Sequence, residues 1–123
     1  MPLPRFASAV FVCALALAGC AGPLSGAESE FDQGHYPQAK QDLAALEAQS
    51  RLWTDAARAE YALYRGLTYG ALGDRARAIV WLGQARAIEL ARPGSLTADL
   101  ERRLRAGLVG CQLAPAPEGQ AEP

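Results

Sequence analysis

The fold of this chain is decided by residues 66–85, which read GLTYGALGDRARAIVWLGQA. Small and apolar residues recur there at helical spacing on both sides of Gly73 and Asp74. Gly73 suits the left-handed end of one helix, and Asp74 suits the N-cap of the next. Two antiparallel helices are therefore predicted, with small residues where they meet and larger ones between their turns. The residues assigned to this contact are Gly66, Tyr69, Gly73, Ala78, Leu82 and Ala85.

This spacing resembles the tetratricopeptide repeat, which carries Leu-Gly-x-x-Tyr on its first helix and Ala-x-x-x-Phe on its second. Ala62 stands where that family has Trp, Arg65 where it has Leu, and Leu90 where Pro is common. The resemblance implies a short solenoid of antiparallel helical hairpins that binds other proteins. The alternative is a generic alanine-rich helical bundle.

A degenerate copy of the pattern precedes the first. Residues 34–46 read GHYPQAKQDLAAL and match residues 73–85, so that Ala39 takes the place of Ala78. The offset between these two alanines is longer than the family repeat, which is about 34 residues. The additional residues are expected in the connection around Trp53 and in a lengthened helix after it. Two copies are fewer than a solenoid usually needs, so either a last helix or another chain must close the core.

The composition predicts an all-α fold of about five helices, because alanine dominates while Val and Ile are scarce beyond the first residues. The helical domain is expected to span residues 27–110. Its segments are predicted at 27–33, 37–49, 55–72 and 74–91, and a capping helix at 95–109 begins at Ser95. Leu96, Leu100, Leu104 and Leu108 form a narrow stripe on that last helix. Residues 111–123 are rich in proline and are expected to form a disordered tail.

The N-terminal residues end an apolar run, behind Arg5, with Leu17-Ala18-Gly19-Cys20. This resembles the lipobox of a bacterial lipoprotein signal peptide. The resemblance implies that residues 1–19 are removed between Gly19 and Cys20 and that Cys20 carries palmitate-type lipid. Residues 20–26 would then form a tether. Ala21 in place of Asp implies the outer membrane, facing the periplasm. A membrane-spanning helix fits this segment less well, because it needs about 20 apolar residues. A plain secretory signal also fits less well, because it would not need the cysteine.

Charge argues against nucleic acid as a partner. Residues 20–123 carry 11 basic residues, the chain's 12 less Arg5, against 13 acidic ones, whereas nucleic acid requires a clustered basic face. Arg102, Arg103 and Arg105 share one face of the last helix, which is either a solvated face or a contact for lipid headgroups. Cys111 is either a small hydrophobe at a helix end or a thiol that bonds another chain.

Catalytic and metal-ligating patterns do not stand out. His35 is the single histidine, and it lies in a turn with no Cys, His or paired carboxylate at ligand spacing. The sequence therefore predicts no enzyme, no catalytic residue, no metal site and no cofactor besides the lipid on Cys20.

A peptide groove is predicted on the helix at 55–72. Leu63 and Leu67 are one turn apart, beside small residues and one acid, and such an apolar face can take a helix or an extended peptide. The predicted residues are Glu60, Leu63, Leu67, Gly70 and Ala71. Alternatively, the helix at 27–33 covers these leucines with Phe31.

These features together favour an adaptor or scaffold lipoprotein that binds protein partners of an envelope assembly. One alternative is a structural lipoprotein that associates with copies of itself. Another is a small ligand-binding or hydrolytic lipoprotein.

Overall fold

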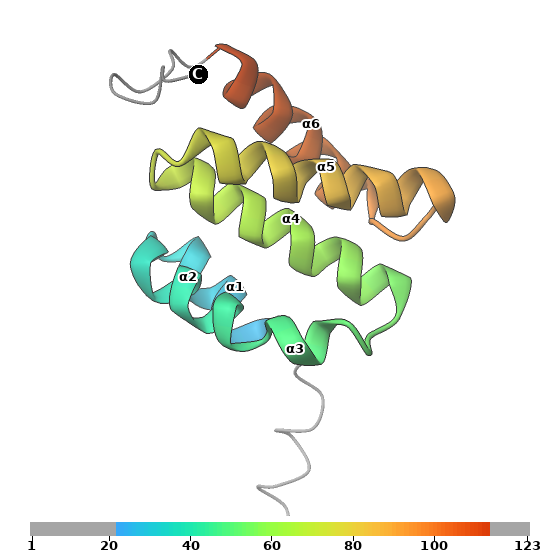
Figure 1. Ribbon diagram of the computed structural model, residues 1–123, viewed down its shortest axis with the longest axis horizontal. Helices are drawn as coiled ribbons and strands as arrows, with labels where there is room; N and C mark the ends of the chain where they lie inside the picture. The colour runs from blue at the N-terminus through green and yellow to red at the C-terminus, as the bar shows by residue number, and fades with distance from the viewer. Residues whose placement is uncertain (1–21, 114–123) are drawn as a thin grey trace, which may run out of the picture.

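The computed structural model describes residues 22–113, which form six α-helices without a strand among them (Figure 1). The predicted all-α fold is confirmed. The helices are α1 (Ser25–Asp32), α2 (Tyr36–Ala45), α3 (Glu47–Ser50), α4 (Asp55–Ala71), α5 (Arg75–Ala91) and α6 (Ala98–Leu113). Within this part of the chain, no helix combines the length and the apolar composition needed to cross a membrane.

The hairpins α1–α2 and α4–α5 turn in the same way. Gly34 and Gly73 adopt φ values of 79° and 81°, which glycine reaches without the strain that a Cβ would impose. In each turn, the residue after the glycine donates its N–H to the carbonyl five residues earlier. His35 donates to Glu30 at 2.8 Å, and Asp74 donates to Tyr69 at 2.9 Å. Both predicted turns are therefore present, and each makes the equivalent hydrogen bond.

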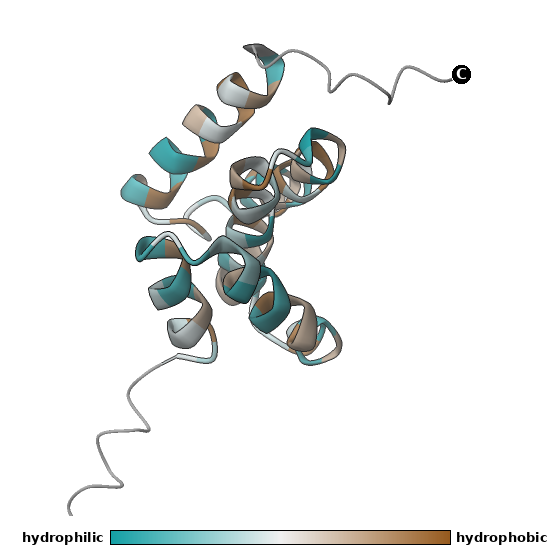
Figure 2. Cartoon of the chain, turned by 90° about the vertical axis from the view of Figure 1, so that its left-hand side faces the viewer, coloured by the Kyte–Doolittle hydropathy of each residue, from teal (hydrophilic) through white to brown (hydrophobic). Residues whose placement is uncertain are grey.

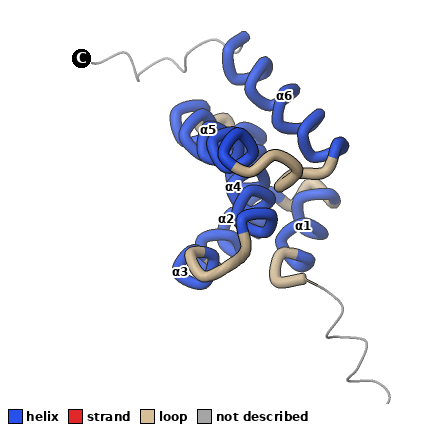
Figure 3. Tube along the Cα trace, turned by 90° about the vertical axis from the view of Figure 1, so that its right-hand side faces the viewer, coloured by secondary structure: helices blue, strands red, loops and turns tan. Residues whose placement is uncertain are grey.

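The hairpin α4–α5 lies at the centre of the domain. The α1–α2 hairpin packs on α4, and α6 packs on both α4 and α5. In Figure 1 they flank the central hairpin, and in Figure 3 α1 and α6 lie on the same side of it. Hydrophobic and hydrophilic residues alternate along α6 in Figure 2, as expected for a helix with one buried face. Of the two possibilities that the sequence left open, the last helix therefore closes this end of the core.

The core holds α4 and α5 unusually close together. A Cβ at Gly66 would lie 2.6 Å from the Cδ2 atom of Leu82, so only glycine fits there. The main cluster of buried residues consists of Ala59, Ala62, Leu63, Tyr69, Ala78, Leu82, Ala85, Leu96, Leu104 and Cys111. A second cluster, of Leu24, Ala27, Leu43, Tyr61 and Tyr64, joins the α1–α2 hairpin to α4.

Several helix boundaries differ from those predicted. The segment predicted at 37–49 divides into α2 and α3 at Leu46. The last helix begins at Ala98, after Thr97 rather than Ser95, because the Thr97 hydroxyl accepts the Leu100 N–H at 3.3 Å. The Ser95 hydroxyl instead donates to the Arg92 carbonyl at 2.6 Å.

The two ends of the domain also extend beyond the prediction. α6 continues to Leu113, because Cys111 lies two turns after Leu104 and is buried with it. α1 begins at Ser25, within the predicted tether, because Leu24 is buried against the α1–α2 hairpin. The lipobox, Cys20 and the tail beyond Leu113 lie outside the described residues.

Candidate functional site

The peptide groove predicted on α4 is closed. Leu63 is fully buried, in the same cluster as Leu96 and Leu104. Leu67 is partly buried, and a Cβ on Gly107 of α6 would lie 3.0 Å from its Cδ2 atom. The prediction of an open groove is therefore wrong. α6 covers these leucines because its own leucine stripe faces the α4–α5 hairpin.

The alternative cover, Phe31 of α1, is also wrong. Its ring lies edge-on to Tyr64, with the two ring centres 5.6 Å apart, and it belongs to the second cluster. Gly70 and Ala71, the remaining small residues of the predicted groove, are exposed at the end of α4. The five residues predicted to form one groove thus do not share an open surface.

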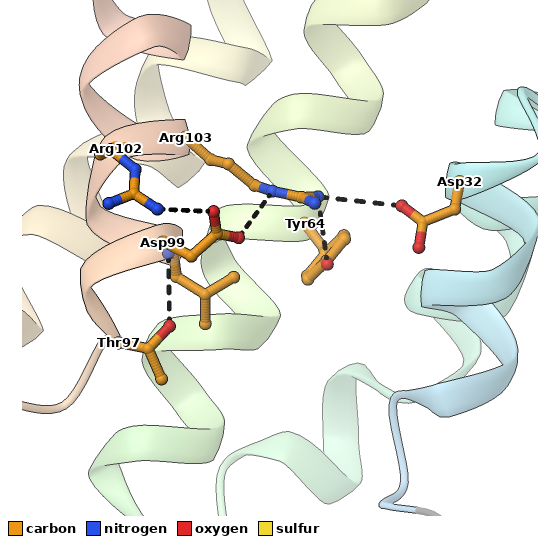
Figure 4. A network of polar contacts seen from close by, with 7 residues as sticks. Asp32, Tyr64, Thr97, Asp99, Arg102 and Arg103 are labelled. Carbon is orange, nitrogen blue, oxygen red and sulfur yellow. Dashed lines mark hydrogen bonds and ion pairs between the residues drawn. The ribbon is translucent and has the colours of Figure 1, made fainter.

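Glu60 instead belongs to a polar network that joins α1, α4 and α6. Arg103 of α6 reaches toward α1, with its Nη1 atom 3.8 Å from Asp32 and 3.5 Å from the Tyr64 hydroxyl (Figure 4). Burial raises the pKa of the Tyr64 hydroxyl, and the charges of Glu28 of α1 and of Glu60 contribute to this rise. Burial, a hydrogen bond to Glu60 and the charges of Glu60 and Asp32 together raise the pKa of Glu28 to about 7, against a lowering by Arg103.

The stability of the domain should therefore fall as pH rises from about 4.5 to about 7. The folded state holds the Glu28 proton more tightly than the unfolded state, where the pKa lies near 4.5. Stability is thus lost as pH rises from the unfolded toward the folded pKa. Solvent screens this half-buried group, so we expect a loss of about 1 kcal/mol. Thermal denaturation followed by circular dichroism measures it. Glu28→Gln should remove most of this slope, and an unchanged slope in that variant would rule Glu28 out.

The basic face of α6 is largely neutralised by its own acids. Arg102 lies 3.1 Å from Asp99, Arg103 lies 3.3 Å from the same carboxylate, and Arg105 lies 3.7 Å from Glu101. This pairing favours a solvated face over a contact for lipid headgroups.

The contacts of His35 and the burial of Cys111 indicate structural roles for both residues. His35 is exposed, and its Nδ1 atom lies 2.8 Å from the Glu30 carboxylate across the first turn. Cys111 is a buried free thiol, which favours its interpretation as a small hydrophobe. Among residues 22–113, no group of three or more His, Cys, Asp or Glu side chains is placed to hold a metal ion.

Arg65 forms a buried network that the sequence pattern did not reveal. Its side chain is 7% exposed, and its guanidinium lies 4.2 Å from the centre of the Trp81 ring. It donates to the hydroxyls of Tyr61 and Tyr69 at 3.2 Å, and it pairs with Glu47 of α3 at 3.2 Å. Arg65 therefore ties α3 to the central hairpin. The signal in the sequence was an arginine at a position where the repeat has an apolar residue.

Above this network lies a cleft between α3, α4 and α5. One part, of about 230 Å³, is lined by the segment that ends α3 and by α4 and α5. A second, shallower part, of about 390 Å³, is more open to solvent; it continues toward the end of α5 and shares Arg58 and Ile88 with the first. We call both parts together the α3–α5 cleft. Its charged lining residues are Glu47, Arg51, Asp55, Arg58 and Arg92, and its apolar lining includes Trp81 and Ile88.

An apolar surface runs along the outer side of α5. Ile79, Val80 and Leu90 are 43%, 57% and 70% exposed. Their spacing, with Leu90 about three turns after Ile79, places them on one side of the helix. Exposed small residues, Ala76, Gly83 and Ala87, lie between them on the same side. We call these six residues the α5 outer face.

Comparison of the chain with protein-family models, with curated proteins and with solved structures found no match.

Proposed function

We propose that this chain is a lipid-anchored helical adaptor that binds a protein partner in the bacterial cell envelope. The observation that carries this proposal is the pair of helical hairpins. Their turns, at His35 and Asp74, make equivalent hydrogen bonds. Stacked helical hairpins of this kind expose extended surfaces, and such surfaces serve binding in helical-repeat proteins. The spacing of Gly66, Tyr69, Ala78 and Leu82 supports the tetratricopeptide type.

The α5 outer face is the surface that we assign to the partner, in place of the closed groove. Isolated exposed apolar residues are common on soluble proteins, but several on one side of one helix mark an interaction surface. The small residues between Ile79, Val80 and Leu90 leave shallow spaces into which a partner's side chains can pack. A helix or a second folded domain fits such a face.

The lipobox supports the anchor and the location. Lipid on Cys20 would hold the domain at the outer membrane, on its periplasmic side, as the resemblance at Leu17–Cys20 and the alanine at position 21 imply. Confinement to a surface raises the effective concentration of two molecules that are both held there. A small interface can then bind a membrane-associated partner usefully.

Substitution of the α5 outer face should strongly reduce recovery of the partner. We expect Val80→Glu and Leu90→Glu each to reduce the partner recovered by crosslinking and pull-down from membranes by tenfold or more, because each places a charge in an apolar contact. Val109→Glu is the matched control, since Val109 is 53% exposed on α6 and lies outside both the α5 outer face and the α3–α5 cleft. Equal recovery with all three variants would remove the face from the proposal. A second copy of this chain as the only crosslinked protein would support self-association instead.

A further inference from the structure

We propose that the α3–α5 cleft binds an acidic segment of a protein partner, with Arg51, Arg58 and Arg92 holding carboxylates and Trp81 and Ile88 taking an apolar side chain. This inference rests on the proposed adaptor function and names the chemistry of the segment that the adaptor receives.

The cleft exists because the stretch between the two hairpins is longer than the repeat requires. α3 (Glu47–Ser50) and the residues after it lie in this lengthened stretch. Glu47 of α3 pairs with the buried Arg65 side chain, and the Trp53 ring packs edge-on against Tyr61 with centres 5.6 Å apart. A wall built in this way is held in place before any ligand arrives.

The arginines of the cleft outnumber its acids. Arg51, Arg58, Arg65 and Arg92 lie in or beneath it, against Glu47 and Asp55. Asp55 is shared between Arg58 at 3.5 Å and Arg92 at 3.2 Å, and Glu47 pairs with Arg65. No ion pair involves Arg51 within the described residues. These four arginines therefore exceed the two acids by two positive charges. One of the four, Arg65, has its guanidinium directly against the Trp81 ring.

The arrangement of the rim arginines suits an extended ligand with several carboxylates. Arg51 lines the first part of the cleft, Arg92 lines the second, and Arg58 lines both. Guanidinium groups bind carboxylates with two parallel hydrogen bonds, which gives both strength and orientation. A compact anion would engage one part of the cleft, whereas an acidic segment can follow all of it.

The floor of the cleft adds an apolar contact. Trp81 and Ile88 are partly buried and face the cleft, with Ala87 and Ala91 beside them. Ala87 also belongs to the α5 outer face, so the two surfaces are continuous along α5. A partner that covers the outer face can therefore extend an acidic segment into the cleft.

Tryptophan fluorescence tests this assignment, because Trp81 lines the cleft and Trp53 packs beside it. The full chain, purified in detergent, is titrated with a twelve-residue peptide of Glu-Glu-Leu repeats that is blocked at both ends. We expect a saturable fluorescence change with this peptide and none with the Gln-Gln-Leu counterpart. Arg51→Gln and Arg58→Gln should each weaken binding about tenfold. Arg105→Gln, at an exposed side chain of α6, should leave peptide binding unchanged.

Three results would overturn the assignment: no saturable change, equal binding of the neutral peptide, or equal weakening by Arg105→Gln. The same change with inorganic phosphate alone would also overturn it, since the cleft would then hold a small anion. Pull-down of the partner from membranes separates the two proposals. If the acidic peptide fails to bind while the partner is still recovered and is lost in Val80→Glu, the acidic segment is wrong and the adaptor function stands.

Discussion

Gly66→Ala is expected to destabilise the domain by about 3 kcal/mol, at the upper end of what overpacking of a close core costs. Its Cβ would lie 2.6 Å from the Cγ and Cδ2 atoms of Leu82 and 2.9 Å from the Leu82 backbone nitrogen. A backbone atom cannot swing aside as the end of a side chain can, so α4 and α5 must move apart. Denaturant unfolding followed by circular dichroism measures the loss.

Gly70→Ala provides the matched control in the same helix. A Cβ there would meet only the Ala78 Cβ at 3.8 Å, an ordinary contact. Alanine is favoured over glycine in helices by about 1 kcal/mol, so this variant should be as stable as the wild type or more stable. Equal stability of the Gly66 and Gly70 variants would contradict the close approach of α4 and α5.

Arg65→Ala is expected to cost about 3 kcal/mol as well, because hydrogen bonds to a charged group contribute about 1.5–3 kcal/mol and truncation of a buried side chain adds the cost of a cavity. The substitution removes the donor to the Tyr61 and Tyr69 hydroxyls and leaves a space against Trp81. The half-exposed Glu47 adds little to this cost, because its carboxylate stays solvated when Arg65 is removed. Thermal unfolding of the purified protein gives the value.

Glu47→Gln separates the ion pair from the rest of the network. Its carboxylate is 47% exposed, and an ion pair with one half-exposed partner contributes about 1 kcal/mol or less. We expect this variant to lose far less stability than Arg65→Ala. Comparable losses would mean that the ion pair, rather than the aromatic and hydroxyl contacts, holds Arg65.

The turns and the central hairpin could be predicted because local chemistry determines them. Gly34 and Gly73 supply positive φ, and Asp74 caps α5 by accepting the Arg77 N–H at 3.2 Å. Each of these effects acts within a short stretch of the chain. The close contact at Gly66 could likewise be predicted, because a small residue on one helix of a hairpin indicates where the other helix approaches it.

The helix that covers Leu63 and Leu67 could not be predicted in the same way. The spacing of Leu63 and Leu67 shows that one side of α4 is apolar, but not which element covers it. α6, which follows α4 only after the whole of α5, takes that place. For this reason Leu63→Glu is expected to unfold the core rather than to report on partner binding.

The α3–α5 cleft escaped prediction because its residues are scattered from Glu47 to Arg92. Its walls depend on the break at Leu46 that starts α3 and on the long-range pairing of Arg65. Neither follows from helical periodicity. The lipobox is the opposite case, a purely local pattern at Leu17–Cys20, and it stays a prediction because those residues lie outside the described part.

Photocrosslinking in intact cells tests the central claim, a lipid-anchored adaptor, most directly. A photoreactive amino acid at position 80, in the α5 outer face, should give one discrete crosslinked product with an envelope protein. The same probe at position 109, which is exposed on α6 away from both proposed contact surfaces, should give none. Cys20→Ser should abolish the product from position 80 by releasing the domain from the membrane. Equal crosslinking from both positions, or a product from position 80 that persists undiminished in Cys20→Ser, would contradict the account.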